Sequence, residues 1–232
     1  MSTAPPVALV TGANRGLGRA ICQDLAARGL TVLLGARDPE AGILAAKELG
    51  VATQEIDVTD PVSISAAHDR IAARYGRLDV LVNNAGVFGT AAVDGDFADI
   101  RHTVEVNLFG AWQTTVAFGG LLRASDHPRV VNVSSGVGSF GEGMTDPRFV
   151  PPAYPVAKAA LNAFTCRLAI AWREAGVLVN AVCPGFIATF PGAEQLGARP
   201  VEDGAASVAW AVTLPDDGPT GGLFRDGQPL PW

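Results

Sequence analysis

Apolar runs of strand length alternate with helical patterns along the whole chain of 232 residues. The runs are continuous stretches of Val, Leu and Ile, which is typical of parallel strands that helices cover on both faces. Connections between such strands are right-handed, so helices come to lie on both sides of the sheet. The alternation therefore predicts an α/β chain with a doubly wound, seven-stranded parallel sheet flanked by helices.

The expected strands are Val7–Thr11, Thr31–Arg37, Gln54–Val58, Leu78–Asn83, Arg129–Ser134, Leu178–Cys183 and Gly222–Phe224. The expected helices are Gly16–Arg28, Pro39–Leu49, Val62–Tyr75, about Asp99–Ala124, about Ala153–Ala175 and Val201–Thr213. No linker rich in Pro, Gly or Ser divides this pattern, so we expect residues 1–232 to form a single Rossmann-type domain. The irregular stretch 136–152 follows a strand, at the edge where such sheets bind ligands.

Composition and charge argue against several classes of protein and site. The chain is 48% hydrophobic and carries a net charge of −6, which argues against a nucleic-acid partner. Its three cysteines are far apart, and the first residues do not resemble a signal peptide, so we expect a cytoplasmic protein. The apolar stretch 104–122 contains Glu105, Asn107 and Gln113, which favours a buried helix over a membrane span. The three histidines lack partners at metal-ligand spacing, so no metal site is expected.

A glycine-rich turn separates the first strand from its helix. Gly12, Gly16 and Gly18 are spaced Gly-x-x-x-Gly-x-Gly, with Asn14, Arg15 and Leu17 between them. Glycine lets the backbone approach a pyrophosphate, and the following helix offers free N–H groups and the positive end of its dipole. We interpret the turn as a dinucleotide site rather than as a purely structural turn.

The end of the second strand indicates which dinucleotide is bound. Asp38 lies where an acid can bind the ribose 2′-hydroxyl of NAD, but Pro39 follows it, which is typical of a helix N-cap. Arg37 at the strand tip and Arg15 in the glycine turn favour a 2′-phosphate. We therefore predict a preference for NADP(H), with NAD as the alternative.

Two further strand ends face the same edge. Asp57 and Val58 end the third strand, where the adenine is expected to lie. Asn84, Ala85 and Gly86 follow the fourth strand, where small residues let the backbone pass close to a ligand. Either segment alone is compatible with ordinary turn chemistry.

A tyrosine and a lysine then stand four residues apart at the start of a helix, after Ser134 and Ser135 end the fifth strand. Tyr154 and Lys158 therefore share one helix face. A free phenol has a pKa of about 10, and a nearby ammonium group lowers it toward the range useful for proton transfer. The pair predicts acid–base chemistry, whereas an exposed helix pair is the alternative.

Taken in order, these motifs resemble the short-chain dehydrogenase/reductase family over nearly the whole chain. The matching segments are Thr11-Gly12-x-x-x-Gly16-x-Gly18, Asn83-Asn84-Ala85-Gly86, Asn107, Ser135, Tyr154-x-x-x-Lys158 and Pro184-Gly185-x-x-x-Thr189. The first strand with its glycine turn, and Ala36-Arg37-Asp38, are most similar to the carbonyl reductase branch, which uses NADPH.

The resemblance implies roles residue by residue. Tyr154 would exchange a proton with the substrate oxygen, Ser135 would hydrogen-bond that oxygen, and Ser134 is the alternative if the register differs by one. Lys158 would lower the pKa of Tyr154 and hold the nicotinamide ribose, and Asn107 would hold a water, unless it is only a satisfied polar group in a buried helix. The implied cofactor contacts are Gly12, Asn14, Arg15, Gly16, Leu17, Gly18, Arg37, Asp57, Val58, Asn84, Ala85, Gly86, Tyr154, Lys158, Pro184, Gly185, Ile187 and Thr189.

The chain departs from the family pattern near the tyrosine. Pro155 follows Tyr154 directly, so Tyr154 must lie in or just before the first helical turn. The spacing from Ser135 to Tyr154 is longer than is common in the family, and we expect the extra residues, among them Phe140, Met144, Phe149 and Pro151, to form part of a substrate wall. Stretches 136–152 and 186–200 are the expected substrate loops, and the second is short.

The sequence therefore predicts an NADPH-dependent oxidoreductase that reduces a ketone or aldehyde to an alcohol, reversibly, by hydride transfer with a tyrosine proton donor. The alternatives are a dehydrogenase or reductase of a dedicated sugar, polyol, steroid or acyl-carrier thioester, and a non-catalytic NADP-binding sensor. Several phenylalanines, among them Phe88, Phe186 and Phe190, suggest an apolar or aromatic small-molecule substrate.

The low charge of the chain indicates either a large core for its length or a surface that another subunit buries. Only 17% of residues are charged, against about 25% in average globular proteins. The least charged helical stretches are 104–122 and 156–172, which are more apolar than covering one sheet face requires. In the family these two helices commonly form a subunit interface, so we expect a homo-oligomer, either a dimer or a tetramer.

Overall fold

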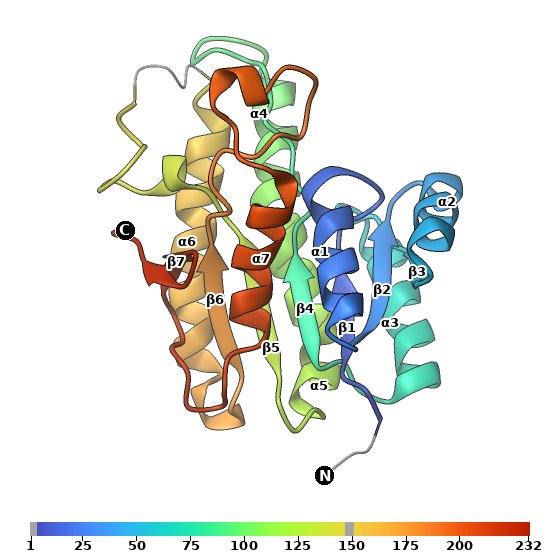
Figure 1. Ribbon diagram of the computed structural model, residues 1–232. Helices are drawn as coiled ribbons and strands as arrows, with labels where there is room; N and C mark the ends of the chain where they lie inside the picture. Colours follow the sequence, from blue (N-terminus) through green and yellow to red (C-terminus); the bar gives the residue numbers. More distant parts are fainter. Residues whose placement is uncertain (1–3, 147–150) are drawn as a thin grey trace.

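A computed structural model describes residues 4–146 and 151–232, which form one sheet with helices on both faces (Figure 1). The strand order is β3-β2-β1-β4-β5-β6-β7-β8. The strands are β1 Val7–Val10, β2 Thr31–Ala36, β3 Ala52–Glu55, β4 Val80–Asn83, β5 Arg129–Val133, β6 Leu178–Val182, β7 Leu223–Arg225 and β8 Gln228–Pro229. All neighbours up to β7 pair in parallel, which confirms the predicted Rossmann-type α/β fold.

The sheet has eight strands rather than the predicted seven. The extra strand, β8, is only two residues long and runs antiparallel to β7. The connecting residues Asp226 and Gly227 have φ values of 50° and 76°, so a tight Asp-Gly hairpin turns the chain back on itself. The Asp-Gly pair was the available sequence signal for this hairpin. A strand of two residues is too short to show the alternation of apolar and polar residues that predicts a strand.

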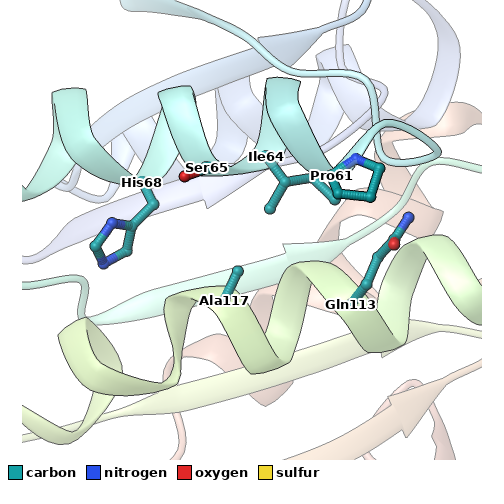
Figure 2. Close-up of a pocket in the computed structure, with 6 residues that line it drawn as sticks. All are labelled: Pro61, Ile64, Ser65, His68, Gln113 and Ala117. Atoms are coloured by element: carbon teal, nitrogen blue, oxygen red, sulfur yellow. The ribbon is translucent and has the colours of Figure 1, made fainter.

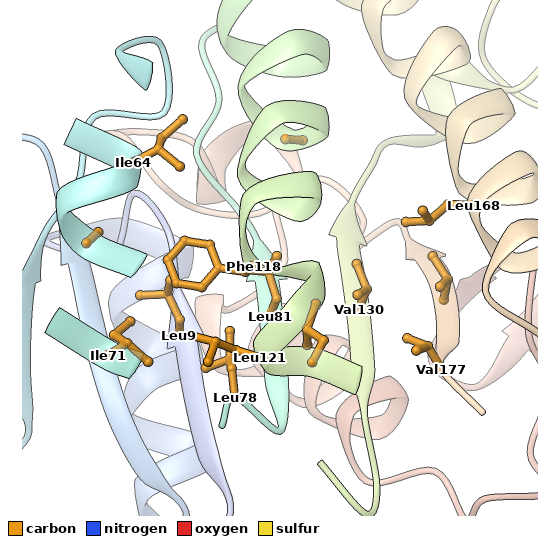
Figure 3. Close-up of a cluster of buried hydrophobic side chains, with 14 of the residues drawn as sticks. Leu9, Ile64, Ile71, Leu78, Leu81, Phe118, Leu121, Val130, Leu168 and Val177 are labelled. Carbon is orange, nitrogen blue, oxygen red and sulfur yellow. The ribbon is translucent and has the colours of Figure 1, made fainter. Parts of the chain in front are cut away.

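Two apolar clusters hold the layers together. The helices are α1 Gly16–Ala27, α2 Pro39–Leu49, α3 Pro61–Tyr75, α4 Phe97–Val104, α5 Ala111–Arg123, α6 Ala153–Ala171 and α7 Val201–Val212. One cluster packs α1, α2 and α7 against one face of the sheet. The other packs α3, α5 and α6 against the opposite face, with Phe118 and Leu81 fully buried (Figure 3). Burial on both faces explains why the strands are continuously apolar.

Helix boundaries follow local capping chemistry. The Asp38 carboxylate accepts hydrogen bonds from the backbone N–H groups of Glu40, at 3.0 Å, and Ala41, at 3.2 Å. This confirms the predicted N-cap of α2, with Pro39 at its first position. Helix α6 begins at Ala153, so Tyr154 and Pro155 lie in its first turn, as Pro155 requires.

Two predicted elements differ from the structure. The helix expected over 99–124 is divided into α4, a π-helical turn at Glu105–Gly110, and α5. The apolar pattern does not distinguish an α-turn from a π-turn, because the same residues stay buried in both. The third strand ends at Glu55, so Asp57 and Val58 lie in the turn that follows it. Among the described residues, no helix is long and apolar enough to cross a membrane.

Candidate active site

The glycine turn lies beside the chain that leaves β4, at the carboxyl ends of the central strands. Gly12 has a φ of 62°, and a Cβ there would stand 2.8 Å from Ala85 Cα. A Cβ on Gly18 would stand 2.8 Å from Ala13 Cα. Glycine is therefore required at both positions by backbone approach, and at Gly12 by conformation as well. Helix α1 starts at this turn without a side-chain cap, so no capping side chain occupies its first N–H groups.

Thr11 and Asn84 tie the glycine turn to the loop after β4. The Asn84 amide donates to the carbonyl oxygens of Thr11, at 2.9 Å, and Gly12, at 3.1 Å. The Thr11 hydroxyl accepts hydrogen bonds from the backbone N–H groups of Asn84 and Ala85, both at 3.1 Å. The sequence analysis assigned no such role to Thr11, although its place at the strand end was a signal. These bonds hold the two loops in one rigid frame.

Two arginines flank this frame. Arg15 and Arg37 are both exposed, and neither guanidinium group has an ion pair or hydrogen bond within the described ranges. The carboxylate of Asp38 beside them caps α2. Two guanidinium groups without protein partners provide what a phosphate group requires.

The predicted adenine contacts lie in a well-ordered turn. Asp57 accepts hydrogen bonds from the backbone and hydroxyl of Thr59, at 2.9 and 2.7 Å. Val58 is buried, and its backbone carbonyl accepts a hydrogen bond from Gln113. The side chain of Val58 also packs on Gly110, where a Cβ would stand 2.8 Å from Val58 Cγ2. The turn is therefore fixed to the π-helical turn behind it.

The predicted catalytic tyrosine lies against the predicted catalytic serine. The hydroxyls of Tyr154 and Ser135 are hydrogen-bonded, and Ser135 also accepts from the backbone N–H of Val137. Ser134 is buried instead and donates to Asn162 Oδ1 at 2.6 Å. The two serines point to opposite sides because adjacent residues at a strand end alternate. The structure thus brings Ser135, and not Ser134, to Tyr154.

Lys158 lies one helical turn below Tyr154 and is buried. Its ammonium nitrogen donates to the Val133 carbonyl at 2.9 Å and stands 5.5 Å from the centre of the Tyr154 ring. A Cβ on Gly86 would lie 3.8 Å from this nitrogen and 2.8 Å from Asn107 Oδ1. Lys158, Gly86 and Asn107 therefore meet at one point, although they come from three separate segments.

Asn107 is held by its amide and leaves its oxygen unused. Its Nδ2 donates to the backbone carbonyls of Val87, at 2.6 Å, and Thr103, at 2.8 Å. Its Oδ1 is buried without a hydrogen-bond partner among the described residues. A buried polar atom of this kind is costly unless water or a ligand satisfies it. This fits the predicted water-binding role better than that of a satisfied core residue.

Burial shifts both ionisable groups toward their neutral forms. It lowers the pKa of Lys158 from 10.5 to about 8. It also raises the pKa of Tyr154 above its ordinary value, contrary to the lowering expected from Lys158, although the Ser135 hydrogen bond acts the other way and Cys183 adds to the increase. At neutral pH the lysine is therefore mostly charged, and the tyrosine carries its proton.

Buried amides and hydroxyls fix the helices behind these groups. Asn83 Nδ2 donates to Asn132 Oδ1 and to Thr115 Oγ1, both at 2.8 Å. Asn132 in turn donates to Thr165 Oγ1 at 2.9 Å. Strands β4 and β5 are thereby joined to α5 and α6, so the α6 backbone that carries Tyr154 has a defined position.

The segment after β6 completes the edge. Pro184 and Ile187 are buried, Gly185 has a φ of 86°, and Thr189 is exposed. Gly16 and Thr189 face each other, because a Cβ on Gly16 would stand 3.6 Å from Thr189 Cγ2. The start of α1 and the segment after β6 therefore lie on either side of the same edge.

One exposed aromatic ring contacts the tyrosine, and others lie on the two expected substrate loops. The Phe88 ring lies 4.6 Å from the Tyr154 ring and is 60% exposed. Phe186 and Phe190 pack on each other at 6.4 Å and are also exposed. Of the predicted substrate wall, Phe140 is exposed, Met144 and Pro151 are partly buried, and Phe149 lies outside the described residues. An apolar surface borders the polar Ser135–Tyr154 pair.

A separate hollow lies between α3 and α5 (Figure 2). Its lining includes Pro61, Ile64, His68 and Gln113, none of which is a predicted site residue. In the described ranges no three His, Cys, Asp or Glu side chains group to hold a metal ion.

The chain is similar to known proteins over most of its length. A sequence profile described as short chain dehydrogenase matches residues 6–197. The chain is 33% identical to (+)-neomenthol dehydrogenase of Arabidopsis thaliana over 97% of each protein. It is 31% identical to salutaridine reductase of Papaver bracteatum, over 96% of this chain and 94% of that protein.

Solved structures show the same likeness in three dimensions. NADPH-bound carbonyl reductase from chicken fatty liver superposes with a TM-score of 0.85 at 26% identity, covering 99% of this chain and 100% of that one. Salutaridine reductase from Papaver somniferum superposes with a TM-score of 0.81 at 29% identity, covering 95% and 99%. The similarity extends over the whole fold and is not confined to the glycine turn.

Proposed function

Because the chain belongs to the short-chain dehydrogenase family of oxidoreductases, we propose that it is an NADPH-dependent reductase of ketones or aldehydes that also runs in reverse. The observation that carries the proposal is the hydrogen bond between Tyr154 and Ser135, with the Lys158 ammonium beside the same ring. Residues 1–232 would act as one catalytic domain. Stretches 136–152 and 186–200 would border the substrate.

Tyr154 would donate its proton to the carbonyl oxygen during reduction. Its raised pKa keeps the proton on the hydroxyl until the oxygen gains negative charge. Ser135 would orient that oxygen by a hydrogen bond. Lys158, mostly charged at neutral pH, would stabilise the tyrosinate that remains, and the unpartnered Asn107 Oδ1 would hold a water that returns the proton.

NADPH, when bound, would supply the hydride. The residues fit such a group: glycines that admit close backbone approach, an uncapped helix start, and two exposed arginines for the 2′-phosphate. Pro184, Gly185, Ile187 and Thr189 would border the nicotinamide, and Tyr154 and Lys158 its ribose. The NADPH-bound carbonyl reductase of similar fold supports this preference.

The substrate would be an apolar or aromatic ketone. Phe88 exposes its ring beside Tyr154, and Phe186 and Phe190 in the second expected substrate loop are also exposed. Rings of this kind contribute most when an apolar ligand covers them. Two similar proteins are named (+)-neomenthol dehydrogenase and salutaridine reductase, which supports a small organic alcohol or ketone as the substrate.

The protein would act as a homo-oligomer in the cytoplasm. Helix α5 exposes Trp112 and Val116, and α6 exposes Val156 and Ile170, which together form an apolar surface that a second subunit would cover. All three cysteines are free, which suits a reducing compartment.

Steady consumption of NADPH with a panel of activated aryl ketones tests the proposal. We expect multiple turnovers per subunit and little rate with NADH. Tight binding of NADPH without turnover on any ketone or aldehyde would instead indicate the cofactor-binding sensor.

A further inference from the structure

A bidentate ion pair joins the last parallel strand to the turn that follows the predicted catalytic serine. Arg225, at the end of β7, donates to Glu142 Oε1 at 2.6 Å and to Oε2 at 3.0 Å. The two side chains are 28% and 33% exposed, so solvent screens the pair only in part. This contact closes a loop of 83 residues in sequence and belongs to none of the motifs above.

The same arginine reaches the backbone next to Ser135. Its second terminal nitrogen also donates to Cys183 Sγ at 3.0 Å, and that sulfur accepts the Gly136 N–H at 3.1 Å. A Cβ on Gly136 would lie 2.9 Å from the guanidinium and would overlap the Glu142 carboxylate. The ion pair therefore packs directly over the peptide that follows Ser135.

The segment beyond Arg225 holds the same turn. Ser139 donates from its hydroxyl to the Pro231 carbonyl at 2.7 Å, and the Gly141 N–H donates to the Trp232 carbonyl at 2.9 Å. Few apolar side chains of this turn are buried, and Phe140 is 73% exposed. Helix α6 holds one side of the turn, where Asn162 Nδ2 donates to the Gly138 carbonyl at 3.2 Å, and polar contacts from β7 and the residues after it hold the other.

We propose that Arg225 and Glu142 are positioning residues that fix Ser135, and through it the Tyr154 hydroxyl, by clamping residues 136–142 to the sheet edge. The inference rests on the proposed function, because its predicted effect on kcat requires the proposed reduction. The clamp acts where the reacting oxygen is oriented, so its loss lowers kcat and leaves the distant glycine turn unchanged. A misplacement of about 1 Å in such a site costs up to about a hundredfold in rate.

The test compares Arg225→Leu, Glu142→Gln and the double variant with the unmodified chain. We expect each to lose about tenfold or more in kcat, with the double variant no worse than Arg225→Leu, because the two side chains act as a unit. The dissociation constant for NADPH stays unchanged. Arg225→Lys keeps the positive charge but loses the planar guanidinium that forms the bidentate pair, so it should retain part of the kcat that Arg225→Leu loses. Arg28→Leu, which breaks the Asp24–Arg28 pair at 2.8 Å on α1, leaves kcat unchanged.

Hydrogen exchange supplies a readout that needs no turnover. Amides of residues 137–146 exchange faster in Arg225→Leu and Glu142→Gln than in the unmodified chain, and α1 amides do not. If Arg225→Leu does not fold, Glu142→Gln carries the test, because Glu142 lies at the surface. An active chain whose kcat and exchange survive Glu142→Gln overturns the inference and leaves the proposed function intact. If the protein reduces no carbonyl compound but the variants still show the faster exchange, the proposed function is wrong and the structural role of the Arg225–Glu142 pair is supported.

Discussion

The Lys158 ammonium lies 5.5 Å from the centre of the Tyr154 ring. It is buried at the end of β5, where the Val133 carbonyl accepts a hydrogen bond from it. A buried cation with a neutral partner costs stability, whereas the same cation stabilises a tyrosinate formed beside it. This geometry supports the proposed role of Lys158 in the reaction rather than a role in folding.

Lys158→Met is expected to stabilise the protein at neutral pH. The folded-state pKa of Lys158, about 8, lies below the ordinary 10.5, so the unfolded chain binds this proton more tightly. The cost in stability of burying the charged lysine is full below pH 8, and it disappears as the pH rises to 10.5. The hydrogen bond from Lys158 to Val133 offsets part of this cost. We therefore expect the substitution to raise the free energy of unfolding by about 1–2 kcal/mol at pH 7, and this increase becomes smaller between pH 8 and pH 10.5.

Denaturant unfolding of both proteins from pH 7 to pH 10 measures this difference. Lys47→Met is the matched control, because Lys47 is the other lysine of the chain and is exposed on α2. The control should show no such dependence on pH. A Lys158→Met protein that is less stable than the unmodified chain at pH 7 would contradict the assignment.

Arg37→Ser is expected to weaken NADPH binding by about tenfold or more while NADH binding changes little. A phosphate loses a charge-assisted hydrogen bond, whereas a ribose hydroxyl does not depend on the guanidinium. Titration of cofactor fluorescence measures both constants. Asp38→Asn keeps an acceptor for the α2 cap and should leave NADPH binding unchanged. An Arg37→Ser protein that binds NADPH as tightly as the unmodified chain would contradict the assignment of Arg37 to the 2′-phosphate.

Val116→Lys is expected to reduce the oligomer to monomers. Val116 is 59% exposed on α5, and burying a lysine between two subunits leaves its charge unpaired. Light scattering at micromolar concentration measures the mass. Leu44→Lys, at a position that is 61% exposed on α2, changes an exposed leucine outside the apolar surface and should keep the oligomer. An unmodified protein that is already monomeric would rule out the interface.

The parallel order of strands and the capping of α2 could be predicted because their causes are local. Continuous apolar strands require cover on both faces, and Asp38 followed by Pro39 specifies a helix start whatever lies nearby. The motif spacing likewise brought Tyr154 and Lys158 to one helix face, and the structure adds that Ser135 meets Tyr154.

Contacts between distant segments could not be predicted in the same way. Arg225 meets Cys183 and Glu142 only because β6 and β7 are neighbours and the turn after β5 folds over both. The π-helical turn at Asn107 has the same hydrophobic pattern as an α-helix, and it packs through Gly110 against Val58, which lies far away in the sequence. Such features depend on packing that no local periodicity encodes.

Tyr154→Phe tests the central claim most directly. The substitution removes one oxygen, and with it the proton donor, while the ring keeps its contact with Phe88. NADPH consumption with an activated aryl ketone should fall by at least about a hundredfold, since general acid catalysis contributes about that much, and NADPH should still bind with its original affinity. A Tyr154→Phe protein that reduces the ketone at the unmodified rate would contradict the account.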